Sequence, residues 1–125
     1  MKKEIFTEHA PAAIGPYSQG VKAGGMIFFS GQIPLCPDGT LSDGDISVQT
    51  EQVLRNMEEV LKAAGCDFSH VVKTTIYLTD LADFAVVNDL YGSCFAPPYP
   101  ARACVQVAAL PKGVDIEIEW VAVTP

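Results

Sequence analysis

Three side chains that can do chemistry lie near the C-terminus of the chain: Arg102, Cys104 and Glu117. A guanidinium can hold a carboxylate through two parallel hydrogen bonds, and a carboxyl group can take up and return a proton. A thiol can act as a nucleophile, but no histidine lies near Cys104 in sequence, so a core or pocket-lining role is the alternative. Arg102 is one of two arginines and is therefore the candidate cation of a pocket for a small anion.

The spacing of these residues predicts that they share one patch of a sheet. Polar and small apolar residues alternate over residues 101–107, and acidic and large apolar residues alternate over residues 115–120. Such alternation places each set on one face of its own strand. If the two strands are antiparallel and joined by the loop between them, Cys104 lies opposite Glu117, with Arg102 one pleat away. The alternative is an ordinary half-solvated sheet face without a site.

The composition limits the kinds of molecule that the chain is expected to bind. With 125 residues, 49% of them hydrophobic and 18% charged, the chain is expected to form one domain over residues 1–125 with a true core. The net charge is −7, from 8 basic and 15 acidic residues, and the lysines are scattered along the sequence. A nucleic acid is not an expected partner, because too few cations are available to replace the counterions of a phosphate backbone.

The cysteines and histidines do not form a metal-binding pattern. They are Cys36, Cys66, Cys94, Cys104, His9 and His70, with no C-x-x-C pair and with the histidines far from the cysteines in sequence. We therefore expect no metal. The N-terminal segment lacks the apolar stretch of a signal peptide, and no run of residues is long enough to cross a membrane. These features predict a cytoplasmic protein with reduced thiols and no membrane partner.

The pattern along the chain predicts six strands and two helices in the order β-β-β-α-β-α-β-β. The strands are expected at residues 4–7, 21–23, 26–30, 71–78, 101–107 and 115–120, and the helices from Asp45 or Ile46 to Ala64 and from Asp80 or Asp83 up to the Pro97-Pro98 pair. This order favours an α+β fold in which one mixed sheet carries both helices on a single face. The other face would lack a cover, so we expect a homo-oligomer.

Three residues outside the C-terminal strands are further candidates for a functional role. Tyr17 lies in a loop rich in proline and glycine, where its ring is either a surface feature or the wall of a pocket. Gly31 follows the third strand and permits a close approach of the backbone or a positive φ. Asn88 interrupts a partly apolar stripe of the second helix, where it either meets water at the edge of the stripe or has a functional role.

Four segments, in order, resemble the RidA family, also called YjgF, of small enamine and imine deaminases. They are AIGPYSQG at 13–20, SGQIP at 30–34, VVKTTIYLTDLADFAVVN at 71–88 and PARACVQVAALPKGVDIEIE at 100–119. The last segment is similar to the family signature, a Pro-Ala-Arg followed at a fixed distance by Ile-Glu-Ile. The resemblance covers nearly the whole chain.

The resemblance implies a fold and a site. The fold is chorismate-mutase-like and α+β, assembled as a homotrimer around a central barrel with clefts between neighbouring subunits. Arg102 would bind the substrate carboxylate, and Glu117 would handle the catalytic water or proton. The other residues implied to line the cleft are Tyr17, Ser30, Gly31, Asn88 and Cys104. Trp120 departs from the small aliphatic residue of many relatives, which affects the packing rather than the chemistry.

The resemblance also implies an activity. It is the hydrolysis of 2-imino acids and their enamine tautomers, such as 2-aminoacrylate and 2-iminobutyrate, to 2-oxo acids and ammonia. An imine is already electrophilic, so no cofactor is expected. Two alternatives stay open: a non-catalytic regulatory protein that binds a 2-oxo acid through Arg102 on the same trimer, and an RNA-acting translation inhibitor. The presence of Glu117 favours the enzyme, and the net charge of −7 argues against the RNA-acting protein.

Overall fold

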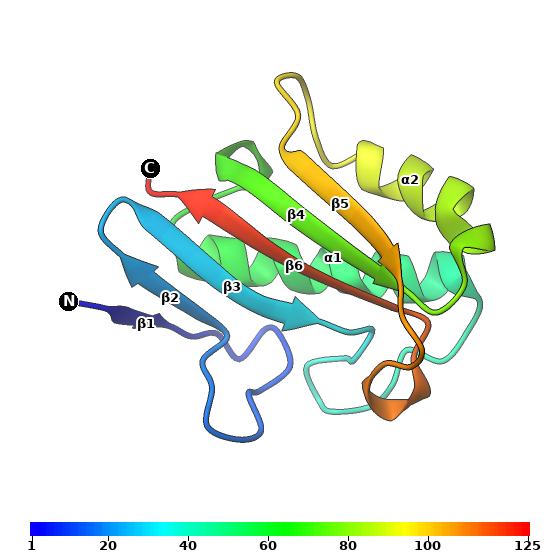
Figure 1. Ribbon diagram of the computed structural model, residues 1–125. Coiled ribbons are helices and arrows are strands. Elements are labelled where there is room, and N and C mark those ends of the chain that lie inside the picture. The colour runs from blue at the N-terminus through cyan, green and yellow to red at the C-terminus, as the bar shows by residue number, and fades with distance from the viewer.

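The computed structural model describes residues 1–125 as a six-stranded sheet with two α-helices on one of its faces (Figure 1). The strands are β1 (Lys3–Ile5), β2 (Gly20–Ala23), β3 (Met26–Gln32), β4 (Val71–Leu78), β5 (Ala101–Gln106) and β6 (Ile116–Val123), and the helices are α1 (Ile46–Ala63) and α2 (Phe84–Gly92). The strand order is β1-β2-β3-β6-β4-β5, and every neighbouring pair is antiparallel except β4 with β5. The predicted α+β fold with one mixed sheet is confirmed.

Helix α1 forms where the sequence predicts it, because both of its ends carry strong local signals. The Asp45 carboxylate accepts a hydrogen bond from the Val48 backbone N–H and caps the first turn. At the other end, Gly65 follows the cap residue Ala64 and has a φ of +74°, a conformation that glycine adopts without strain. The apolar face of the helix lies against the sheet and closes the core.

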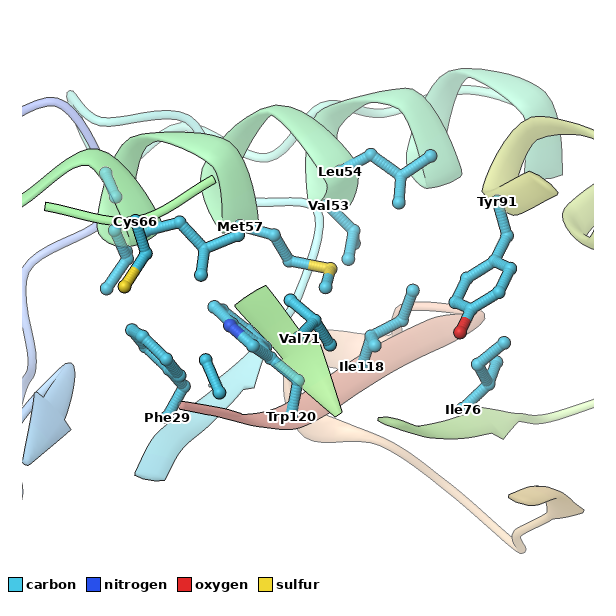
Figure 2. Close-up of a cluster of buried hydrophobic side chains, with 14 of the residues drawn as sticks. Phe29, Val53, Leu54, Met57, Cys66, Val71, Ile76, Tyr91, Ile118 and Trp120 are labelled. Carbon is cyan, nitrogen blue, oxygen red and sulfur yellow. The ribbon is translucent and has the colours of Figure 1, made fainter. Parts of the chain in front are cut away.

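The core lies between α1 and the helix-covered face of the sheet (Figure 2). Trp120 of β6 stacks on Phe29 of β3 with ring centroids 4.7 Å apart, and both rings lie on the side of the sheet that faces α1. The indole is 2% exposed, and its N–H has no hydrogen-bond partner. Trp120 therefore fills volume in the core, which agrees with the expectation that it affects packing rather than chemistry.

The predicted hairpin of β5 with β6 is wrong. Strand β4 lies between them: Ile76 of β4 is opposite both Cys104 of β5 and Ile118 of β6. Helix α2 is the crossover of a parallel β4-α2-β5 unit, which places β5 at the edge of the sheet, and the chain then passes the end of β4 to insert β6 antiparallel beside it. Cys104 therefore lies opposite Ile76 and not opposite Glu117.

The first strand and the second helix differ in their bounds from the prediction. Strand β1 covers Lys3–Ile5 instead of 4–7. A short 3-10 turn at Leu81–Asp83, capped by the Asp80 carboxylate, precedes α2, which begins at Phe84. Helix α2 ends at Gly92, well before the proline pair, because glycine is a poor helix former and the Ser93 hydroxyl donates to the backbone carbonyl of Leu90.

Candidate functional site

The expected site residues form two separate clusters. Tyr17, Ser30, Gly31 and Glu117 line a cavity of about 460 Å³. Asn88 and Arg102 line a second cavity of about 480 Å³, together with Tyr91, Gly92, Tyr99 and Pro100. We call these the Glu117 half-site and the Arg102 half-site.

The two half-sites lie on opposite faces of the sheet. Thr74 of β4 is opposite both Arg102 of β5 and the buried Trp120 of β6, so the Arg102 side chain is on the helix-covered face. Glu117 is one residue removed from the buried Ile118 along β6 and is therefore on the open face. The expectation that one chain brings Arg102 and Glu117 into a shared patch is thus wrong, because the sheet itself separates them.

The Glu117 carboxyl is held against an irregular end of strand β3. The β3–β6 register shifts between Phe29 and Gln32, and Gly31 lies within this irregular stretch. A Cβ added to Gly31 would overlap the Glu117 carboxylate, so glycine is needed for this close approach. Burial raises the pKa of the Glu117 carboxyl above its ordinary value, and the negative charge of Glu119 raises it further.

A buried glutamine joins the two ends of the loop that carries Tyr17, and Ser30 ties this loop to strand β3. The Gln19 side chain accepts a hydrogen bond from the Thr7 N–H at 2.8 Å and donates to the carbonyls of Thr7 and Pro11. The Ser30 hydroxyl donates to the Ser18 carbonyl at 2.6 Å, so its oxygen keeps its capacity to accept. Gln19 was missed from the sequence, where a glutamine beside a glycine has no distinguishing signal.

The Arg102 guanidinium is oriented by α2 and has no acidic partner. Its Nη1 donates to Asn88 Oδ1 at 2.7 Å, and its Cζ lies 5.3 Å from the Phe84 ring centroid and 5.1 Å from that of Tyr91. The Tyr91 hydroxyl is bonded in turn to Thr74 Oγ1 at 2.8 Å. The guanidinium therefore has free N–H groups and a full charge to offer to an anion.

Phe84 and Tyr91 were missed from the sequence, although a usable signal exists. Together with Asn88 they stand at spacings of four and three residues, which places all three on one face of α2. Asn88 thus belongs to the face that contacts Arg102, and its functional role stays a prediction.

Cys104 lies on the same sheet face as Arg102 but lines neither cavity. It is half-buried and packs against the core. Burial raises the pKa of its thiol, and the nearby Arg102 charge opposes this rise. A thiol that keeps its proton is a poor nucleophile, so the structure favours the core role over the catalytic alternative.

Outside the half-sites, the chain has neither a metal-binding cluster nor a membrane-spanning helix. No group of three or more His, Cys, Asp or Glu side chains is arranged to hold a metal ion. Neither α-helix is sufficiently long and apolar to cross a membrane.

Comparison with known proteins relates this geometry to a family. Residues 7–124 match the family model described as Endoribonuclease L-PSP. The chain is 55% identical over 124 residues to the Arabidopsis thaliana chloroplastic Reactive Intermediate Deaminase A, covering 98% of the chain but 66% of that protein. It is 52% identical over 124 residues to the human 2-iminobutanoate/2-iminopropanoate deaminase, covering 98% of the chain and 90% of that protein.

The chain belongs to the RidA (YjgF) family.

A solved structure shows that the fold of this chain also agrees with the RidA family. The E. coli protein TdcF, solved with bound serine, superposes with a TM-score of 0.91 at 46% identity, covering 98% of this chain and 99% of that one. The resemblance found in the sequence is thereby confirmed at the level of family and fold. The chain spans just under two thirds of the length of the Arabidopsis relative and nearly all of the other two.

Proposed function

We propose that this protein is a hydrolytic deaminase that converts 2-imino acids and their enamine tautomers, such as 2-aminoacrylate and 2-iminobutyrate, to 2-oxo acids and ammonia. The observation that carries the proposal is the pair of half-sites: an oriented arginine without an acidic partner, and a half-buried carboxyl with a raised pKa. The first suits a substrate carboxylate, and the second, which ionises less readily than an exposed carboxyl group, suits the transfer of a proton. Relatives more than 50% identical that are named as such deaminases support it.

We further propose that the working site forms between subunits of a homotrimer, with the chorismate-mutase-like architecture implied by the sequence. One chain holds Arg102 and Glu117 on opposite faces of its sheet, so a substrate that touches both needs the Arg102 half-site of one subunit and the Glu117 half-site of another. The open face also carries exposed apolar side chains, including Phe28 at 51% and Val105 at 42% exposure, which a barrel interior would cover. Light scattering should give about three times the 13.4 kDa chain mass.

The reaction follows from the roles of these side chains. Arg102 holds the substrate carboxylate through the N–H groups that Asn88 leaves free, and so orients the C=N carbon. Glu117 takes a proton from a water molecule as the water oxygen attacks that carbon, and it passes this proton to the substrate nitrogen, which gives a carbinolamine. Glu117, ionised again, takes the hydroxyl proton of the carbinolamine and delivers it to the nitrogen, so that the C–N bond breaks, ammonia leaves and the C–O bond becomes the carbonyl of the 2-oxo acid. An enamine enters the same path after a proton moves from its nitrogen to its β-carbon.

The other cleft residues have supporting roles in this scheme. We propose that the Tyr17 hydroxyl and the Ser30 oxygen, which line the same cavity as Glu117, hydrogen-bond the water or the substrate nitrogen, while Gly31 leaves room for the carboxylate. Cys104 supports the strand that carries Arg102. No step requires a cofactor, because the C=N carbon is already electrophilic. A cytoplasmic location with all four thiols reduced stays a prediction of the sequence.

The deciding experiment is a coupled assay in which 2-aminoacrylate is generated in situ and the release of pyruvate or ammonia is timed with and without the protein. We expect the protein to accelerate release. Glu117→Gln, nearly isosteric, should lower turnover by about 10²–10⁴-fold while calorimetry still detects pyruvate binding, because Arg102 is intact. The control is Glu51→Gln, which removes an equal charge from the exposed side of α1.

Two outcomes would point elsewhere. Pyruvate binding without acceleration by the wild-type protein would favour the regulatory 2-oxo acid-binding alternative. A Glu117→Gln variant with wild-type turnover would make Glu117 a structural residue. The RNA-acting alternative has no support in the charge, since the net charge is −7.

A further inference from the structure

Three polar side chains lie close together on the open face of the sheet, and the proposed reaction uses one of them. They are Glu117 and Glu119 of β6 and Tyr77 of β4. Tyr77 is directly opposite Glu117 in the antiparallel β4–β6 pair, whereas Thr75 is opposite Glu119. The Tyr77 hydroxyl nevertheless reaches Glu119 Oε1 and donates a hydrogen bond to it. The tyrosine thus stands beside one carboxyl group and fixes the other.

The hydrogen bond fixes the position of the Glu119 carboxylate. The bond to Glu119 and the charges of both carboxylates raise the pKa of Tyr77 to about 12, so the phenol keeps its proton and stays a donor at any working pH. Because the neutral phenol donates to it, the Glu119 carboxylate is held on the sheet face that it shares with Glu117.

Neither Glu117 nor Glu119 forms an ion pair with a cation. The side chains that face Glu117 or share its cavity and carry titratable groups are Glu119, Tyr77, Asp115, Tyr17 and Lys112. The ion pairs of the structure involve Lys62 and His70 alone, and Asp115 is bonded to Gln49 and Thr79. Lys73 lies further along the open face, in a hollow with Glu119, without forming an ion pair. Glu117 thus has the Glu119 carboxylate, and no ion-paired cation, beside it on its own sheet face.

We propose that Tyr77 and Glu119 are positioning residues of the deaminase, which together set the protonation state of Glu117. This inference rests on the proposed role of Glu117 as the group that moves protons. A carboxyl group that must act as base and then as acid needs both of its states within reach at the working pH. Burial alone makes Glu117 harder to ionise, and the fixed Glu119 anion acts in the same direction.

The variants Glu119→Gln and Tyr77→Phe test the proposal without placing new bulk on the sheet. On the acid side of the pH profile, kcat/KM should rise as Glu117 ionises in the free enzyme, and we call this part of the profile the acid limb. In Glu119→Gln this limb should move to lower pH, because removal of the neighbouring anion makes Glu117 ionise more easily. Tyr77→Phe should move it in the same direction, because Glu119 loses the hydrogen bond that holds its carboxylate beside Glu117. Glu51→Gln, the matched charge control on α1, should leave the limb in place.

A double-mutant comparison separates this role from a structural one. Because the hydroxyl acts through the Glu119 charge, Tyr77→Phe should move the limb in the wild-type background and leave it unmoved in the Glu119→Gln background. An acid limb that stays in place in Glu119→Gln, with turnover intact, would overturn the proposal. So would a Tyr77→Phe shift of equal size in both backgrounds.

A second measurement does not depend on catalysis. The side-chain carboxyl carbon of Glu117 can be titrated by NMR in protein labelled at glutamate, with its signal assigned from Glu117→Gln. The midpoint should fall in Glu119→Gln and stay unchanged in Glu51→Gln. If the protein proved to have no deaminase activity, the proposed function would fail while this titration still decided whether Glu119 controls Glu117. If the protein is active and the midpoint does not move, the inference fails by itself.

Discussion

Replacement of Arg102 by lysine isolates the geometry of the guanidinium from its charge. In the structure, Nη1 is engaged by Asn88 at 2.7 Å, which leaves the remaining N–H groups to hold both oxygens of a carboxylate. A lysine ammonium keeps the positive charge and can replace one of these two bonds. It cannot supply the second, because it lacks the planar fork.

The expected loss is therefore one charge-assisted hydrogen bond. Such a bond contributes about 1.5–3 kcal/mol, which corresponds to a fall of about 10- to 150-fold in kcat/KM. The affinity for pyruvate, which has the same carboxylate, should fall by a similar factor. The Phe84 and Tyr91 rings do not change this estimate, since an ammonium is also attracted to an aromatic face.

Two measurements on one preparation would check the estimate: the steady-state rate of 2-aminoacrylate hydrolysis, and calorimetric titration with pyruvate. The chain's other arginine, Arg55 on the exposed side of α1, provides the matched control, and Arg55→Lys should be neutral in both. If Arg102→Lys keeps more than half of the wild-type kcat/KM and affinity, Arg102 acts as a distant charge and the bidentate reasoning is refuted.

Three further outcomes are expected. Gly31→Ala should lower kcat and leave the circular dichroism spectrum unchanged, because the added methyl group displaces the Glu117 carboxylate. The control is Gly25→Ala, which should keep the wild-type kcat because an added Cβ meets nothing within 4 Å there. Glu117→Gln should raise thermal stability at neutral pH. The pKa of Glu117 is raised in the folded state, so the stability that the carboxyl group contributes is lost as the pH rises through that pKa. The advantage of glutamine should vanish below pH 4.5, the ordinary pKa of a glutamate, where the carboxyl group is protonated in both states. Trp120→Ala should cost about 3–5 kcal/mol in denaturant unfolding, since the indole is fully packed; a cost below about 1 kcal/mol would contradict that packing.

Much of the fold could be predicted because its signals are local. Helix α1 was correctly placed by the Asp45 cap, the apolar spacing and Gly65, and strand β4 by its run of β-branched residues. The topology at the C-terminal end could not be predicted in the same way. Alternation defines the two faces of a strand, but it does not reveal which strand becomes its neighbour, and the crossover through α2 placed β5 outside β4.

The candidate site shows the same limit. Alternation correctly grouped Arg102 with Cys104 and Glu117 with Glu119 on the faces of their own strands. Whether those faces coincide depends on the register with β4, which is a property of the folded sheet. Gln19 could not have been found either, because its role comes from hydrogen bonds to Thr7 and Pro11, which only the folded loop brings beside it.

The separation of Arg102 and Glu117 by the thickness of a sheet has a genetic consequence under the proposed assembly. A subunit with Arg102→Ala keeps an intact Glu117 half-site, and a subunit with Glu117→Gln keeps an intact Arg102 half-site. Neither variant alone can form a complete cleft, yet trimers assembled from both can. Random mixing of equal amounts would restore about one quarter of the clefts, where the intact halves happen to meet. Two inactive alleles of this protein should thus complement each other when expressed in the same cell, which no site contained within one chain could do.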